Sequence, residues 1–419
     1  METTRPAMAG EPAKARDPRL ALLEKEMQAE LRDILDWWKS YVLAPDGTSF
    51  YGSVDNDNQP DLSAVRGLVM HARILWAFSS GYAITHDQKH LAVAEVAYSY
   101  LTSHFHDKAF DGYFWSLDAA GNPHDTRKQV YGQAFCVYAF AAFYQQCARQ
   151  EVLDRAIALF RLIESRSREN IYGGYIEAFN RDWSGATELR LSPKDQNDRK
   201  TMNTHLHIIE AYATLYLVWP DQILRESIQG LLRIFSKHFI NRETGALLLF
   251  FTDEWETTSH LRSYGHDIEA SWLLLQCAVI IQDELLEREF GELALLTAKA
   301  ASEGLDSDGG LWYESDKTAG GLIREKHSWP QAEAMIGYFN AWQLSSDKDY
   351  LEKSLGAWGF IKKYLKDNSA GEWYWGVKDD YSLMDKEKAG FWKCPYHNTR
   401  ASIELISRLG NGTDTNLQT

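Results

Sequence analysis

Cysteine is scarce in this sequence, and the four residues present, Cys136, Cys147, Cys277 and Cys394, stand far apart. Because they form no CxxC pair, we expect free thiols in a reducing compartment rather than a disulfide framework. Long apolar runs are also lacking, since no stretch approaches the roughly 18 apolar residues that a membrane span requires. The simplest expectation is a cytoplasmic protein.

Phosphate-binding and nucleophile motifs are missing as well. The sequence contains no Walker A motif, no GxGxxG after a predicted strand and no GxSxG. Positive charge is in deficit, with 44 Lys and Arg against 59 Asp and Glu and a net charge of −15. A surface this acidic repels nucleic acid and anionic lipid but not a neutral sugar, so we expect no nucleic-acid partner and no membrane partner.

The two ends of the chain differ from the rest in composition. Residues 1–17 are small and polar, contain Pro6 and Pro12, and lack the apolar core of a signal peptide. We predict a disordered tail at 1–17, a single catalytic domain at 18–410 and a flexible tail at 411–419.

Aromatic residues and internal repetition are abundant. The 15 Trp, 21 Tyr and 18 Phe suit either a large core or the apolar faces of a bound sugar. A glycine- and aromatic-rich segment recurs at intervals of roughly 60 to 70 residues, and each copy predicts a turn followed by a short strand. The copies begin at Asp46, Phe110, Tyr172, Thr244, Asp308 and Ala370.

Each copy is flanked by two helical segments of different character. The preceding one has an apolar and a charged face, in residues 20–42, 90–106, 151–166, 222–238, 285–303 and 350–366. The following one is apolar on most sides, in residues 66–78, 131–144, 201–216, 265–277, 331–342 and 398–409. Six such pairs predict an all-α fold with an inner ring of helices inside an outer ring, and loops walling a cleft at one end. An open solenoid is the alternative, disfavoured because neither end has a polar capping repeat.

Polar residues stand near the start of every apolar segment. Asn203 and His207 are four residues apart, and the pairs His266 with Glu269 and His397 with Arg400 are three apart, so each pair shares a helix face. A carboxylate beside an imidazole fixes its tautomer and raises its basicity, and we expect this of Glu269 toward His266. Burying such groups is costly unless they are paired, so their recurrence predicts a lined pocket. The others are His71, Arg73, Tyr131, Gln133, His205, Tyr264, Asp267, His327, Trp329, Gln331, Glu333, Trp392, Tyr396 and Asn398.

Two patterns imitate other kinds of site. The His-x-His spacings at 104–106 and 205–207 resemble metal ligands, but helix positions two apart diverge by about 200°, so we expect no metal. Cys394 and His397 could form a nucleophile pair, which we consider the weaker interpretation.

Five segments carry a resemblance to a known family: Ala72–Trp76, Asn203–Tyr212, Tyr264–Trp272, Trp329–Ala334 and Trp392–Asn398. In this order they resemble the cellobiose 2-epimerases of the N-acylglucosamine 2-epimerase superfamily, from about Leu20 to Leu409. The resemblance implies an (α/α)6 barrel, no cofactor, and epimerisation at C2 of the reducing-end glucose of a β-1,4-linked disaccharide. Cellobiose is the expected substrate, with lactose or mannobiose as further candidates. The sequence departs from the family at Ser328, where many members have Trp, and at His71, where many have Asn.

The resemblance also implies roles for individual residues. The catalytic candidates are His266 and His397, as an acid/base pair, and His207, which could assist ring opening. The substrate-binding candidates, from the resemblance and from the polar helix starts, are Arg73, Tyr131, Asn203, Glu269, Trp329 and Trp392. Inversion at C2 needs a proton-transferring group on each face of a planar cis-enediolate, and histidine suits both because its pKa lies near neutrality.

Alternative functions remain open at this point. An aldose–ketose isomerase or an N-acylglucosamine 2-epimerase would use the same residues. A glycoside hydrolase needs two carboxylates, for which Asp195, Asp198, Glu254 and Glu269 are candidates, but it gives no reason for the histidines. A carbohydrate-binding protein without catalysis is a third class. The chain is expected to be a monomer or a homodimer.

Overall fold

The structure is a computed structural model that describes residues 17–316 and 320–410. The tails predicted at 1–17 and 411–419 lie outside this part of the chain, except for Asp17, whose side chain caps the first helix by accepting from Arg19 N. The division into domains therefore stays a prediction.

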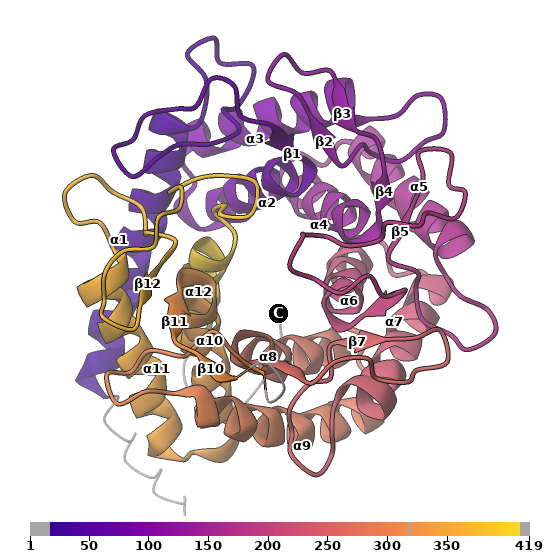
Figure 1. Cartoon of the computed structure of the whole chain (residues 1–419). Helices are drawn as coiled ribbons and strands as arrows, with labels where there is room; N and C mark the ends of the chain where they lie inside the picture. Colours follow the sequence, from indigo (N-terminus) through magenta and orange to yellow (C-terminus); the bar gives the residue numbers. More distant parts are fainter. Residues whose placement is uncertain (1–16, 317–319, 411–419) are drawn as a thin grey trace, which may run out of the picture.

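Twelve α-helices in the described residues alternate between an outer and an inner ring (Figure 1). The outer ring consists of α1 (Pro18–Tyr41), α3 (Gln88–Tyr100), α5 (Gln150–Arg166), α7 (Gln222–Ile234), α9 (Glu284–Ala301) and α11 (Lys348–Phe360). The inner ring consists of α2 (Leu68–Thr85), α4 (Val130–Cys147), α6 (Met202–Val218), α8 (Tyr264–Ile280), α10 (Ser328–Ser345) and α12 (His397–Gly410). Because α12 packs against both α1 and α2, the ring closes. The predicted (α/α)6 barrel is confirmed, and the open solenoid is wrong.

The ends of the outer helices follow from local sequence. An aspartate side chain accepts from a backbone N–H at the start of all but one of them, at Asp17, Asp87, Asp221, Asp283 and Asp347. Three of them continue into a single π-helical turn, at Leu101–Phe105, Phe235–Phe239 and Ile361–Leu365. No helix in residues 17–316 or 320–410 combines the length and the apolar character needed to cross a membrane.

Short antiparallel strands gather at one end of the barrel. The strand before an inner helix pairs with a strand in the hairpin of the next repeat, as in β1 with β2, β4 with β5, β6 with β7, β8 with β9 and β11 with β12. Two more strands, β3 and β10, extend hairpins by pairing with β2 and β9. The strands are β1 (Arg66–Gly67), β2 (Ser116–Leu117), β3 (Pro123–Asp125), β4 (Lys128–Gln129), β5 (Ala178–Phe179), β6 (Lys200–Thr201), β7 (Phe250–Phe251), β8 (Leu261–Ser263), β9 (Glu314–Asp316), β10 (Gly321–Ile323), β11 (Glu325–His327) and β12 (Gly376–Lys378).

Several polar residues of the inner helices hold these hairpins in place. Gln133 accepts from Tyr113 N and donates to the carbonyl of the same residue, both at 2.8 Å, and Gln331 makes the same pair of bonds to Leu311. His205 Nε2 accepts from the backbone N–H of Tyr175 at 2.9 Å. Each of these anchors stands five residues after a buried lysine of the preceding strand. Satisfying the backbone of a buried turn explains why polar residues recur at this position.

The expectation that all the polar helix starts line a pocket is therefore wrong in part. Asp267 Oδ1 accepts from Leu247 N at 2.8 Å, and His71 Nδ1 bonds the carbonyl of Gly67 at 2.8 Å. Like the anchors above, both side chains turn away from the cavity described below.

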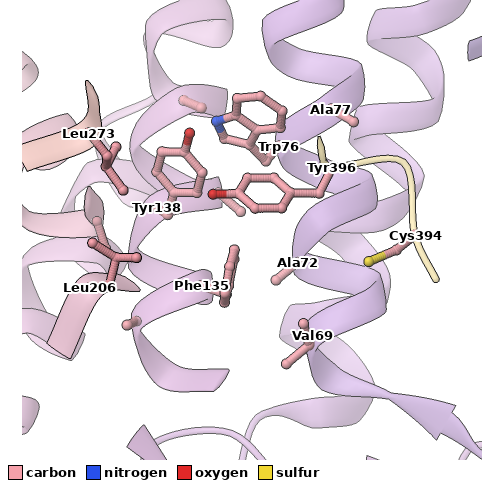
Figure 2. Packing of buried hydrophobic residues seen from close by; sticks show 14 of the residues in the cluster. Val69, Ala72, Trp76, Ala77, Phe135, Tyr138, Leu206, Leu273, Cys394 and Tyr396 are labelled. Carbon is pink, nitrogen blue, oxygen red and sulfur yellow. The ribbon is translucent and has the colours of Figure 1, made fainter. Parts of the chain in front are cut away.

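Aromatic rings fill the barrel interior between α2, α4 and α12. Trp76 stacks on Tyr138 with ring centroids 5.2 Å apart, and Tyr396 meets Trp76 edge-on at 5.3 Å. Figure 2 shows these three rings gathered, with Leu206 and Leu273 on the side of the neighbouring helices. The aromatic cluster is a rigid base on which polar side chains can be held.

Candidate active site

A cavity of about 890 Å³ is lined by the first turns of the inner helices and by the neighbouring strands and loops. All nine side chains predicted from the sequence line it: His207, His266, His397, Arg73, Tyr131, Asn203, Glu269, Trp329 and Trp392. The tertiary structure thus brings together residues from six helix starts that are spread over more than 300 positions.

The repeat decides which positions face the cavity. Arg73, His207 and Glu269 each stand seven residues after the basic residue of their strand, and Tyr131 and Trp329 stand three after theirs. Positions three and seven differ by one helical turn, so they share a face, whereas the hairpin anchors at position five point elsewhere. The histidines do not share one position of the repeat. His207 stands seven residues after Lys200, whereas His266 stands four residues after Arg262.

His397 is fixed from behind by a carboxylate of the neighbouring helix. Its Nδ1 lies 2.7 Å from Glu333 Oε1, and Glu333 is fully buried. Burial, together with the nearby guanidinium groups of Arg73 and Arg400, holds the pKa of His397 well below its usual range. Because Nδ1 is bonded to Glu333, Nε2 is the nitrogen available to a ligand.

The other two histidines are held through Nδ1 in the same way. His207 Nδ1 lies 2.9 Å from Glu210 Oε2, one turn along the same helix. His266 Nδ1 lies 2.9 Å from the hydroxyl of Ser263, the residue that caps α8. Burial lowers the pKa of His266 to about 4, against the opposing effect of Glu269. All three imidazoles can therefore present Nε2 to the cavity.

The expected hydrogen bond between Glu269 and His266 is not formed. Glu269 instead accepts from Arg400, which also donates to Glu333 at 2.7 Å and to Glu210. Arg400 thus joins three buried carboxylates from α6, α8 and α10. The predicted face shared by His397 and Arg400 exists, but the two residues meet through Glu333.

Arg73 lies in an aromatic surround with little charge compensation. It donates to the hydroxyl of Tyr131 at 2.8 Å and to the sulfur of Cys394 at 3.4 Å. Its guanidinium carbon lies 4.3 Å from the ring centre of Phe135 and 4.5 Å from that of Tyr396. Within the described residues, Arg73 Nε, Asn203 Oδ1 and Glu269 Oε2 are buried without a hydrogen-bond partner. Such groups at a cavity wall are suited to a polar ligand.

Two tryptophans form aromatic walls. The ring centroid of Trp329 lies 4.9 Å from that of His266 and 5.4 Å from that of His397, so the indole contacts both imidazoles. Trp392 packs against Trp115 and Tyr131, with ring centroids 5.8 Å and 6.0 Å apart. Flat apolar faces beside polar groups suit the C–H face of a sugar ring.

Sequence reasoning missed the partners that orient the histidines. Glu210 lies within a segment quoted for the family resemblance and is three residues after His207, so helical spacing could have identified it. Glu333 also lies within such a segment, but its contact with His397 spans 64 residues, so no local spacing predicts it. At the outer end of the cavity, the residues missed are Lys194, which donates to Tyr313, and Glu325, which bonds His327 Nε2 at 2.8 Å.

The competing site interpretations fit the geometry poorly. His205 anchors a hairpin whereas His207 faces the cavity, so the two do not converge on a metal. Cys394 contacts Arg73 and the carbonyl of Trp392 rather than His397. Of the hydrolase candidates, Asp195 and Glu269 line the cavity but Asp198 and Glu254 do not.

One group of potential metal ligands does exist in the described residues. Ligand atoms of Glu269, Glu333 and His397 lie within 4.8 Å of one another. Both carboxylates, however, bond the guanidinium of Arg400. A positive group of the protein itself thus already contacts both anions.

Histidines in an aromatic-walled cavity of an (α/α)6 barrel suit an enzyme that acts on a carbohydrate. Residues 49–401 match the N-acylglucosamine 2-epimerase (GlcNAc 2-epimerase) family, and the chain belongs to it. The chain is 42% identical over 387 residues to a cellobiose 2-epimerase from Bacteroides fragilis, covering 92% of this chain and 99% of that protein. It is 33% identical over 392 residues to a cellobiose 2-epimerase from Dictyoglomus turgidum, covering 93% and 100%.

Solved structures agree with the sequence comparisons. The cellobiose 2-epimerase of Bacillus thermoamylovorans superposes with a TM-score of 0.89 at 36% identity, covering 93% of this chain and all of that chain. A GH76 α-mannanase from Bacteroides thetaiotaomicron, at 11% identity and a TM-score of 0.65, shares the fold alone. The chain is a carbohydrate epimerase, and its substrate is a small sugar.

Proposed function

We propose that the enzyme interconverts glucose and mannose at the reducing end of a β-1,4-linked disaccharide, turning cellobiose into glucosylmannose. The observation that carries this proposal is the placement of His266 and His397. They come from different helices, both contact the ring of Trp329, and each is fixed through Nδ1 so that Nε2 remains for a sugar. The similarity to cellobiose 2-epimerases over nearly the whole chain supports this substrate class.

The reaction begins with opening of the sugar ring, which exposes C1 as an aldehyde and makes the proton on C2 acidic. His207, held by Glu210, would assist by moving a proton at the ring oxygen. One imidazole of the pair His266 and His397 then removes the C2 proton to give a cis-enediolate. The other returns a proton to the opposite face, and the product has the inverted configuration.

Negative charge develops on O1 when the C2 proton leaves. Arg73 is a buried cation that lines the cavity, it bonds Tyr131 and Cys394 rather than a carboxylate, and its Nε lacks a partner. Asn203, at the start of α6, could donate as well. Donors that are already fixed in a water-poor site stabilise such charge more effectively than water does.

The outer part of the cavity would hold the second sugar ring. It is walled by Lys194, Tyr313, His327 and Trp375, which lie beyond the histidines toward the hairpins. His327 stacks on Tyr313 with ring centroids 3.8 Å apart, which makes this wall stiff. Lactose and mannobiose differ from cellobiose in rings this wall would contact, and we propose them as secondary substrates.

The proposed reaction also bears on cofactors, partners, location and oligomeric state. We infer that no cofactor, metal, nucleic acid or membrane is needed, because proton transfer by histidines requires none. The four cysteines are free thiols, which supports a cytoplasmic location. A monomer or a homodimer would serve this chemistry equally well.

Turnover of cellobiose in D₂O tests the proposal. An imidazole that takes the C2 proton can exchange it with solvent, so we expect deuterium at C2 of glucosylmannose and of recovered cellobiose by NMR and mass spectrometry. Free glucose would indicate a hydrolase, and glucosylfructose an aldose–ketose isomerase. Epimer that retains full protium at C2, even at low conversion, would contradict proton transfer by two histidines.

A further inference from the structure

The buried groups around the histidines carry an excess of negative charge. The buried cations are Arg73 and Arg400, and the buried anions are Glu210, Glu269 and Glu333, all three bonded to Arg400. Each of these five residues is at most 4% exposed. The nearby Lys393 is already balanced by Glu372, with Nζ 2.9 Å from Oε1. With the histidines neutral, two cations against three anions leave one uncompensated negative charge, which is costly in a buried site.

A bound proton is the simplest compensation, and the hydrogen bonds indicate where it resides. Burial alone would raise the pKa of Glu210, but Arg400 and His207 lower it to about 2, so Glu210 stays ionised. Burial raises the pKa of Glu333 despite the opposing effect of Arg400. The hydrogen bond of 2.7 Å from Glu333 Oε1 to His397 Nδ1 then lets the two residues share a proton.

We propose that Glu333 is a positioning residue that holds one proton jointly with His397 in the sugar-free enzyme, so that Nε2 of His397 faces the cavity as an N–H. His266 bonds only the hydroxyl of Ser263 through Nδ1, and its Nε2 faces the cavity without a proton. This inference rests on the proposed function, because two-sided transfer at C2 needs one acid and one base at the same moment. The charge imbalance supplies that single proton.

Groups on every surrounding helix influence this proton. They are Arg73 on α2, Tyr131 on α4, His207 and Glu210 on α6, His266 and Glu269 on α8, Glu333 on α10, Arg400 on α12, and Tyr396 directly before α12. Removing a carboxylate from this set weakens the attraction for the proton, and removing a guanidinium strengthens it. An arrangement that is merely structural would not respond with opposite signs.

The pH profile of kcat/KM provides the first test. Activity that needs this proton is lost as the pH rises, so the alkaline limb reports its release. In Glu210→Gln the limb should move to lower pH, and in Arg400→Gln to higher pH, each by about 1–3 units as is usual for one nearby charge. Shifts in the same direction, or no shift in folded variants, would overturn the proposal.

Conservative and control variants separate charge from structure. Arg400→Lys keeps the charge and should leave the limb in place even if the rate falls. Asp267→Asn removes a buried carboxylate of the same helix as Glu269, but one bonded to Arg262 and to the hairpin, so only stability should change.

Glu333→Gln can still bond His397 Nδ1 but cannot hold the proton, and kcat should fall about 10²-fold or more. A kcat within a few-fold of wild type would contradict the role of Glu333.

¹⁵N NMR of the sugar-free enzyme detects directly whether Nε2 of His397 is protonated. With ¹⁵N-labelled histidine, and the His397 signal assigned by its loss in His397→Asn, Nε2 should be protonated at pH 7. The pH at which it loses the proton should move down in Glu210→Gln and up in Arg400→Gln. Because no sugar is present, this result stands even if cellobiose is not epimerised. A wild-type Nε2 without a proton at pH 7 would refute the inference.

Discussion

Glu333 Oε1 lies 2.7 Å from Nδ1 of His397, although the two residues are 64 positions apart. Helices α10 and α12 are neighbours in the inner ring, and their first turns meet beside the cavity. The contact fixes which nitrogen of His397 a sugar can reach.

Replacing either proposed acid/base residue should abolish epimerisation without unfolding the barrel. We expect His266→Asn and His397→Asn each to lower kcat about 10²–10⁴-fold, because a positioned proton-transfer group contributes that much. Circular dichroism should match the wild type. Near-normal turnover in either variant would remove that histidine from the mechanism, and His205→Gln serves as a control histidine outside the cavity.

Trp392→Ala should weaken sugar binding more than it weakens the fold. Trp392 is only partly buried and lines the cavity, so much of its face is free for a ligand. We expect a raised KM with a modest change in melting temperature. The opposite result, a loss near the roughly 3–5 kcal/mol of a core tryptophan with KM unchanged, would make it a packing residue.

His205 should make the fold sensitive to acid. Burial lowers its pKa to about 3, so the native state binds its proton far less readily than the unfolded chain, whose histidine titrates near 6.5. Stability from this residue is therefore present above about pH 6.5 and is lost as the pH falls toward 3. Between pH 7 and pH 5 the loss should approach about 2 kcal/mol.

Glutamine is the matched substitution, because Gln133 and Gln331 anchor their hairpins from the same position of the repeat. We expect the melting temperature of His205→Gln to fall less than that of the wild type when the pH is lowered from 7 to 5. Equal losses in the two proteins would show that His205 does not contribute to acid sensitivity.

Chelation should leave activity unchanged. Arg400 already bonds both carboxylates of the ligand-like group of Glu269, Glu333 and His397. We expect the same rate before and after dialysis against EDTA. An enzyme that loses activity and regains it only with added Zn²⁺ or Mn²⁺ would contradict this.

The sequence alone determined the architecture and much of the candidate site. Six copies of a turn segment with two helices of different polarity predict two concentric rings, because helical amphipathicity is a local property. The nine residues nominated for the site all line one cavity, although other polar residues of the same helix starts anchor hairpins instead. The functional roles of these residues remain predictions.

Only the tertiary structure decided how those residues are paired. Spacing suggested Glu269 as the partner of His266, yet Glu269 bonds Arg400 and His266 bonds Ser263. Spacing predicted that His205 and His207 point apart, but only the structure shows that His205 holds a hairpin while His207 faces the cavity. Partners within one helix turn follow from the 3.6-residue period, but contacts between α6, α8, α10 and α12 depend on closure of the ring. The charge balance around Arg400 exists only when that ring is closed, so no local pattern could reveal it.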